Sequence, residues 1–376
     1  MLIGLPRMHK EPGELRDFLP ELVQFLAHRD AVTGIVLEEG YGAGMAYSSW
    51  QYSRLSPKVE FGSHQDCLEQ DVVLVLRCPA EADLAMIRQG AVLLSMLHYT
   101  TNPSRNELLM SAGIHAVSLD SIVDDQGRRL VENMRAVGWN GMEAAFRELV
   151  RTLPGFDDPD RGPIRGTILG SGAVAGAAAF AAARYGDQDL RGRLVARGVR
   201  GVEVTMIDFD LTWDLGYLAE RLSRSDILVD ATRRPDPTKF IVPNHLLSEL
   251  PEHAVILDLS ADPYNFAISP AIVKGIEGIP QGDLDHFVFP TTDPAYDALA
   301  NHVEVGARRL ALSCYSWPGV HPAKCMAHYG AQLEPILDVV TCKGCDAWSL
   351  TSDHHIERAL ARAEVTRWTE LANASR

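Results

Sequence analysis

The chain has 376 residues, of which 46% are hydrophobic, and a formal net charge of −15 at pH 7. This length allows more than one hydrophobic core, so two domains are expected. The negative charge and the lack of any Lys/Arg block argue against nucleic acid as a partner and favour small molecules. No apolar run is long enough to span a bilayer, and the start MLIGLPRMHK lacks a signal-peptide pattern, which predicts a cytoplasmic protein with no membrane partner. The six scattered cysteines are expected to be reduced thiols.

Strand-like apolar runs alternate with helix-like stretches along the whole chain, which is typical of an α/β protein. In the first part, strands are predicted at 2–5, 34–39, 71–76 and 91–97, and helices at about 13–28, 45–55, 81–88 and 104–112. The segment 134–153 has helical spacing of its apolar residues and precedes a stretch rich in Pro, Gly and Asp. It is interpreted as a connecting helix followed by a linker.

A second alternating set follows this helix. Strands are predicted at 166–170, 202–208, 226–230 and 254–260, then a helix at 297–312, with further helical pattern after 330. The tail also contains Cys342 and Cys345 in CKGC, followed by His354 and His355. A single CxxC is a weak zinc signal, so two reduced thiols are favoured and no metal is expected.

A glycine-rich turn directly follows the predicted strand at 166–170. Gly170-Ser171-Gly172-Ala173-Val174-Ala175 matches G-x-G-x-x-G/A and leads into the strong helix former AAAFAAAR. The first glycine permits a tight turn, the second lets backbone N–H groups approach a pyrophosphate, and the small third residue allows close packing of helix and strand. The motif therefore predicts a dinucleotide site, to which we assign Gly170, Ser171, Gly172, Ala173 and Val174, although three glycines can also form an ordinary tight turn.

An acidic residue supports the nucleotide interpretation. Asp208 lies at the end of the next predicted strand, where a carboxylate can accept hydrogen bonds from a ribose 2′-OH and would repel a 2′-phosphate. The expected cofactor is therefore NAD. The spacing from Gly172 to Asp208 exceeds the usual value, which predicts an insertion at about 185–198. We also assign Ala231 and Thr232, which follow the strand at 226–230, to the cofactor site.

Several segments, taken in order, resemble one known superfamily. These segments are IGLPRMHKEPGELRDFLPELV, VLVLRCPAEADLAMIRQGAVLLSMLHYTTNP, SLDSIVDDQGRRLVENMRAVGWNGMEAAF, ILDLSADPYN and SCYSWPGVHPAKCMAHYG. Over about residues 1–335 the chain resembles alanine dehydrogenase, lysine-forming saccharopine dehydrogenase and the nucleotide-binding subunit of transhydrogenase, and is most similar to the saccharopine branch. The resemblance implies two Rossmann-like, doubly wound parallel-sheet domains separated by a cleft. It places a discontinuous substrate domain at 1–138 and 316–376, and an NAD-binding domain at 139–315.

The resemblance also implies roles for individual residues. Arg16 matches an arginine that binds the substrate carboxylate, and His98 matches a histidine at the end of a strand. Arg135 lies near the hinge, where the saccharopine branch has an aromatic residue, and is expected to contact substrate. Three further residues match positions beside the nicotinamide: Asp262, Ser316 and Trp317.

The sequence departs from the family pattern at Arg77, where the family carries a lysine. A buried lysine can lose its proton, whereas guanidinium stays charged, so Arg77 is expected to hold a carboxylate and not to transfer protons. His98 is then the remaining acid or base, because its reference pKa lies near neutrality. Two arginines, Arg16 and Arg77, suit a substrate with two carboxyl groups.

The expected activity is an NAD(H)-dependent oxidoreductase that acts on the C–N bond of an amino acid or opine-type secondary amine. Two alternatives stay open: a lyase or cyclodeaminase that uses bound NAD as an internal redox catalyst, and a nucleotide or amino-acid sensor without turnover. A homodimer is compatible with the resemblance.

Overall fold

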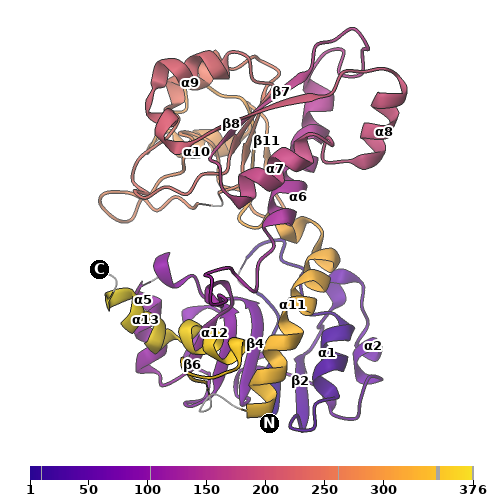
Figure 1. Cartoon of the computed structure of the whole chain (residues 1–376), viewed down its shortest axis with the longest axis vertical. Helices are drawn as coiled ribbons and strands as arrows, with labels where there is room; N and C mark the ends of the chain where they lie inside the picture. The colour runs from indigo at the N-terminus through magenta and orange to yellow at the C-terminus, as the bar shows by residue number, and fades with distance from the viewer. Residues whose placement is uncertain (10, 102, 261, 344–347, 375–376) are drawn as a thin grey trace. The chain divides into compact units, whose positions relative to one another are not determined.

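The computed structural model describes residues 1–9, 11–101, 103–260, 262–343 and 348–374. The chain divides into two compact units, unit 1 (Met1–Asn133 with His321–Arg376) and unit 2 (Met134–Val320). The sequence predicts the boundaries after 138 and 315, and the structure has them after 133 and 320. Each unit has one six-stranded sheet (Figure 1).

The sheet of unit 1 is parallel throughout, in the order β3-β2-β1-β4-β5-β6. Its strands are β1 (Leu2–Leu5), β2 (Gly34–Glu38), β3 (Val59–Gly62), β4 (Val72–Arg77), β5 (Val92–Met96) and β6 (His115–Ser118). The central strands are buried along almost their full length, because helices cover both faces of the sheet. The chain reverses its direction of winding between β1 and β4, which makes the carboxyl ends of these strands a topological switch point.

Helices pack on both faces of this sheet. They are α1 (Pro20–Ala27), α2 (Ser49–Ser53), α3 (His64–Leu68), α4 (Glu81–Leu84), α5 (Pro103–Ser111), α11 (Pro322–Lys343), α12 (His355–Ala363) and α13 (Val365–Ala374), with short 3-10 turns η1 (Ala43–Met45), η2 (Tyr99–Thr101) and η3 (Leu119–Ser121). One core lies under α1, α11 and α12, and a second lies under α3, α4, α5 and α13. The alternating side chains of each strand feed the two cores, as in β4, where Leu74 joins the first and Val75 the second.

The sheet of unit 2 has the order β11-β12-β10-β9-β7-β8 and is parallel except for β11. Its strands are β7 (Ile164–Leu169), β8 (Val202–Ile207), β9 (Ile227–Asp230), β10 (Val255–Asp258), β11 (Val288–Phe289) and β12 (Leu310–Ser313). The switch point of this sheet lies between β7 and β9.

The helices of unit 2 also form two layers. They are α6 (Met134–Thr152), α7 (Ala173–Ala182), α8 (Gln188–Ala196), α9 (Leu215–Leu222) and α10 (Pro294–Leu299), with 3-10 turns η4 (Phe209–Trp213), η5 (Asn244–Glu249) and η6 (Trp317–Val320). The side chains of α6, α7 and α8 fill one core, and those of α9, η5 and α10 fill the other. Both units are therefore three-layer α/β domains, which confirms the expected fold class.

The structure corrects several predicted elements. The helix expected at 297–312 is wrong: α10 ends at Leu299, and 310–313 form β12, because these residues pair with β10 on one side and β11 on the other. The helix expected from 13 begins only at Pro20, and that expected at 45–55 shrinks to α2. The stretch 154–163 does not link the units, because α6 belongs to the core of unit 2. The segment at about 185–198, which the sequence predicts to be an insertion, contains α8.

No helix in the described ranges is both long enough and apolar enough to cross a bilayer.

Candidate functional site

The glycine turn of unit 2 lies where β7 passes into α7, at the switch point of the sheet. Gly170 has a φ of +99°, and a Cβ there would lie 2.8 Å from the carbonyl oxygen of Ala231. A side chain at 170 is therefore excluded by both backbone strain and crowding. Gly172, the N-cap of α7, has an ordinary φ of −75°, and a Cβ at this position would meet nothing within 4 Å. The backbone of Gly172 thus faces open space at a helix N-terminus, where anions are favoured.

Asp208 follows β8 directly and lies beside this turn. Its Oδ1 accepts hydrogen bonds from the hydroxyl of Ser171 at 3.0 Å and from the amide of Phe209 at 2.8 Å. The aspartate is exposed. The structure therefore brings Asp208 into contact with the glycine turn, as the sequence predicts, and the extra residues between them in the chain contain α8.

The neighbouring strand ends carry a buried charge network that the sequence analysis missed. Lys274 is fully buried, and its Nζ donates to Asp258 Oδ2 at 2.5 Å, to the carbonyl oxygen of Asp262 at 2.9 Å and to Ser313 Oγ at 3.1 Å. Burial acts to raise the pKa of Asp258, but the ammonium of Lys274 lowers it below its usual value. The acids at the ends of β9 and β10 are visible in the sequence, whereas the lysine is in a loop that nothing in the pattern connects to them.

Asp230, at the end of β9, is the second buried acid of this network. Its Oδ1 accepts from the amide and the hydroxyl of Thr232, at 3.0 and 2.6 Å. Burial, together with the charge of Asp258, raises the pKa of Asp230 to about 6 from 3.8. Ionisation of Asp230 above this pH therefore lowers the free energy of unfolding. The predicted cofactor residues Ala231 and Thr232 directly follow this acid in the chain.

We expect Asp230→Asn to stabilise the protein in a pH-dependent way. The carboxyl ionises near pH 4 in the unfolded chain but only near pH 6 in the folded protein, so it costs no stability below about pH 4, and its cost grows as pH rises to about 6 and is constant above. One pKa unit corresponds to about 1.4 kcal/mol, so the gain from the variant is on the order of 2–3 kcal/mol at pH 8 and vanishes near pH 4. Urea unfolding of both proteins across this range measures it, and an equal difference at both ends would contradict the account.

The remaining predicted residues of unit 2 are also placed. Asp262 forms an ion pair with Arg234, Oδ2 to Nη2, at 2.8 Å, and the side chain of Arg234 is almost completely buried. Trp317 is 1% exposed, and its indole Nε1 donates to the carbonyl oxygen of Asp258 at 2.7 Å, so its side chain lies in the core. The amide of Ser316 donates to Cys314 Sγ at 3.4 Å. Arg135, on α6, is exposed, and its guanidinium lies 5.9 Å from the centre of the Phe180 ring.

In unit 1, a pocket lies at the carboxyl ends of β1 and β4, the switch point of that sheet. Arg77, the last residue of β4, lines this pocket and pairs with Glu11, Nη2 to Oε1, at 3.0 Å. Both side chains are about one quarter exposed. A guanidinium in this position can exchange one carboxylate for another from solution.

His98 follows the neighbouring strand β5, in a left-handed conformation with φ of +51°. Its Nδ1 lies 3.2 Å from Oδ2 of Asp120, and its backbone amide donates to the other carboxylate oxygen at 3.3 Å. Burial acts to raise the pKa of Asp120, but the contacts with His98 and Ser118 outweigh this effect and lower the pKa to about 2. An ionised aspartate thus orients a half-exposed imidazole, an arrangement that suits proton transfer. Asp120 was missed; its position after β6, the next parallel strand, is the signal that identifies it.

Arg16 precedes α1 and is nearly completely buried. Its guanidinium forms a bidentate pair with Glu14, at 2.8 Å and 2.5 Å, and its Nη1 lies 3.7 Å from Cys325 Sγ. Burial lowers the pKa of Arg16, but the pair with Glu14 raises it more, so the charge persists. The carboxylate-binding fork of Arg16 is therefore filled by a residue of the same chain.

The cysteine motif of the tail is only partly within the structure. Cys342 is exposed at the end of α11, and Cys345 lies outside the described residues.

Comparisons with known proteins find sequence similarity over the first third of the chain. Residues 10–135 match the family model "Alanine dehydrogenase/PNT, N-terminal domain". Alanine dehydrogenase 1 from strains of Staphylococcus aureus is 23% identical over 137 residues, which is 36% of this chain and 36% of the relative. The match therefore spans little more than a third of the length of these curated relatives.

The fold of the whole chain is similar to two solved structures. The superposition on an L-alanine dehydrogenase covers 97% of this chain and 94% of the other, with a TM-score of 0.71 and 17% sequence identity. The transhydrogenase from Sinorhizobium meliloti covers 97% and 96%, with a TM-score of 0.59 and 16% identity. At these identities the likeness concerns the fold. The nearer likeness to the saccharopine branch stays a prediction.

Proposed function

From the match of residues 10–135 to the alanine dehydrogenase/PNT N-terminal domain, we propose that the chain is an NAD(H)-dependent oxidoreductase acting on the C–N bond of an amino acid or an opine-type secondary amine. The observation that carries the proposal is the turn at Gly170–Gly172, which joins a strand to a helix at the switch point of unit 2 with Asp208 beside it.

The residues of this turn fit a dinucleotide. The open space at Gly172 leaves room for a pyrophosphate close to the backbone, and the N-terminus of α7 supplies N–H groups and a positive dipole end. The hydroxyl of Ser171 donates a hydrogen bond to Asp208 Oδ1, and a ribose hydroxyl would take over this acceptor when the dinucleotide binds. When bound, NAD accepts or donates the hydride.

The residues of unit 1 supply orientation and proton transfer in this proposal. Arg77 holds the substrate carboxylate by exchanging it for Glu11. His98, oriented by Asp120, holds or releases the proton of the reacting amine or of the water that attacks its imine. Arg16 joins as a second carboxylate anchor only where a substrate displaces Glu14.

Arg77→Met is expected to raise KM for the amino-acid substrate at least about tenfold, because a charge-assisted bidentate pair contributes roughly 1.5–3 kcal/mol. Arg77→Lys keeps the charge without the fork and should give an intermediate KM. Steady-state kinetics of both variants measures the effect. Arg151→Met, at an exposed arginine on α6, serves as the control. An unchanged KM in Arg77→Met would remove this residue from substrate binding.

The choice of NAD over NADP tests the role of Asp208. Calorimetric titration should show NADH binding at least about tenfold more tightly than NADPH, since the carboxylate repels a 2′-phosphate. Asp208→Asn removes that repulsion and should narrow the difference. Equal affinities in the unmodified protein would contradict the assignment of Asp208, and no binding of either nucleotide would contradict the proposed function.

A further inference from the structure

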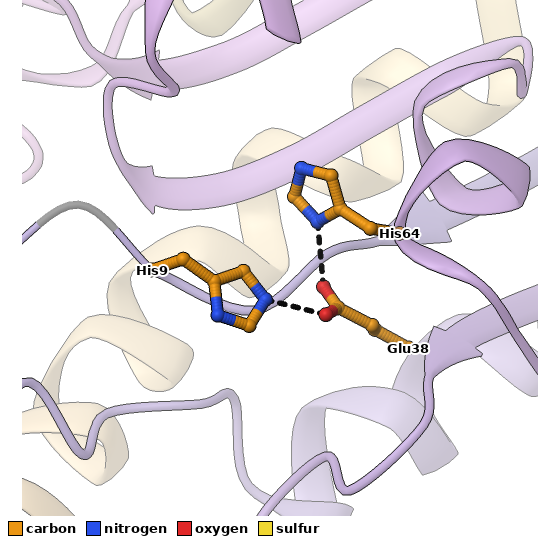
Figure 2. A group of neighbouring side chains, drawn as sticks. All are labelled: His9, Glu38 and His64. Atoms are coloured by element: carbon orange, nitrogen blue, oxygen red, sulfur yellow. Dashed lines mark hydrogen bonds and ion pairs between the residues drawn. The ribbon is translucent and has the colours of Figure 1, made fainter.

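Three side chains meet at the carboxyl ends of neighbouring strands in unit 1, and none of them is used in the proposed function. His9 follows β1, Glu38 is the last residue of β2, and His64 begins α3 directly after β3. Because β1, β2 and β3 are adjacent and parallel, their ends bring the three residues together. Figure 2 shows both imidazole rings directed at the carboxylate of Glu38.

Each imidazole contacts a different oxygen of that carboxylate. His9 Nε2 contacts Oε1, and His64 Nδ1 lies 2.8 Å from Oε2, which also accepts from the amide of Arg7 at 2.7 Å. One ligand atom from each of the three side chains lies within 4.8 Å of the other two. Donors bound to one ion at about 2.1 Å lie at most about 4.2 Å apart, so small side-chain rotations suffice to bind a metal.

The electrostatics of the cluster favour a cation. Glu38 is 7% exposed, and its two carboxylate oxygens contact the amide of Arg7 and the imidazoles of His9 and His64. Its side-chain partners in the cluster are imidazoles, the commonest metal-binding side chains in proteins. A divalent ion would compensate the buried charge through all three ligands.

The surroundings of the cluster resemble those of a metal site. His64 Nε2 lies 3.7 Å from Oδ1 of Asp83, so a carboxylate faces the ring nitrogen that points away from Glu38. A shift of a few tenths of an ångström would bring this carboxylate within hydrogen-bond distance, where such a group orients a metal-binding histidine and strengthens it as a ligand. His9, His64 and Asp83 also line the pocket that contains Arg77, which leaves a way in for an ion from solvent.

We infer that His9, Glu38 and His64 form a binding site for a divalent transition-metal ion of the Zn²⁺ type. Two imidazoles and one carboxylate are a ligand set that such ions take in proteins, with further positions left for water or substrate. The site shares its pocket with Arg77 but requires no nucleotide, so its metal binding is measured independently of the proposed function.

Zinc titration of the full chain tests the site. After treatment with a chelator, the protein should bind one equivalent of Zn²⁺ by calorimetry, with a Kd below about 10 μM. His9→Ala is the decisive variant, because the side chain is 52% exposed and its loss leaves the fold intact. This variant, and His64→Ala, should weaken binding at least about tenfold.

Two controls separate this site from others. His28→Ala changes an exposed histidine at the end of α1 and should leave Zn²⁺ binding unchanged. Replacing Cys342 and Cys345 by serine should also leave it unchanged, which excludes the CKGC tail. Binding that survives His9→Ala and His64→Ala, or is absent from the unmodified protein, would overturn the inference. NADH affinity should be the same in His9→Ala, so failure of the metal site is distinguishable from failure of the proposed function.

Discussion

Gly172→Val should reduce NADH affinity at least about 100-fold, or roughly 2.7 kcal/mol, while leaving the midpoint of thermal unfolding almost unchanged. The backbone at 172 has an ordinary extended conformation, and a Cβ there meets nothing within 4 Å, so the fold accepts a side chain. A bound pyrophosphate needs that same space. Calorimetric titration with NADH, together with thermal unfolding, measures both effects.

Gly176→Ala provides the matched control for this variant. Gly176 lies one turn along α7, is exposed, and likewise has open space at its Cβ position. The substitution removes a helix-interior glycine and should stabilise the protein by about 0.5–1 kcal/mol without changing NADH affinity. If Gly172→Val bound NADH as tightly as Gly176→Ala, the turn would have only a structural role.

Lys274→Met is expected to lower the free energy of unfolding by about 3–5 kcal/mol. The variant leaves Asp258 buried without its cation, close to a second buried acid, Asp230, whose pKa is already raised by burial and by the charge of Asp258. It also removes the donor to Ser313. Urea unfolding followed by tryptophan fluorescence measures the loss.

A double variant shows whether the loss is electrostatic. Lys274→Met combined with Asp258→Asn removes both charges and should recover more than half of the lost stability. Lys239→Met is the control, because Lys239 is 66% exposed and its pair with Asp236 is at the surface. Its effect should stay below about 0.5 kcal/mol. A change of under about 1 kcal/mol in Lys274→Met would contradict the importance of this network.

The sequence predicts the strands of both sheets well where the runs are long and buried on both faces. The run at 71–76 and the glycine turn at 170 are examples, because continuous apolar residues and a strand-turn-helix motif are local signals. The run at 310–313 is predicted as part of a helix, since three apolar residues and a serine are too few to show a period, and only pairing with β10 and β11 makes them a strand.

The chemistry of the site was less accessible from the sequence. His98 and Arg77 were identified from strand ends and a family resemblance, but their acidic partners, Asp120 and Glu11, depend on how distant segments meet. The ion pair between Glu14 and Arg16 is a local contact, but the family resemblance assigns Arg16 to a substrate carboxylate and so does not predict it. The cluster of His9, Glu38 and His64 brings together residues far apart in the chain, and only the strand order reveals it.

Absorbance at the NADH band measures whether the chain, as we propose, transfers a hydride between NAD(H) and the carbon of a C–N bond. The purified chain is mixed with NAD⁺ and a panel of amino acids and opine-type amines, or with NADH, 2-oxo acids and amines. We expect a substrate-dependent change in absorbance, at a rate that His98→Ala reduces at least about 100-fold because the acid or base is lost. A panel without any change in absorbance, from protein that binds NADH, would contradict the claim.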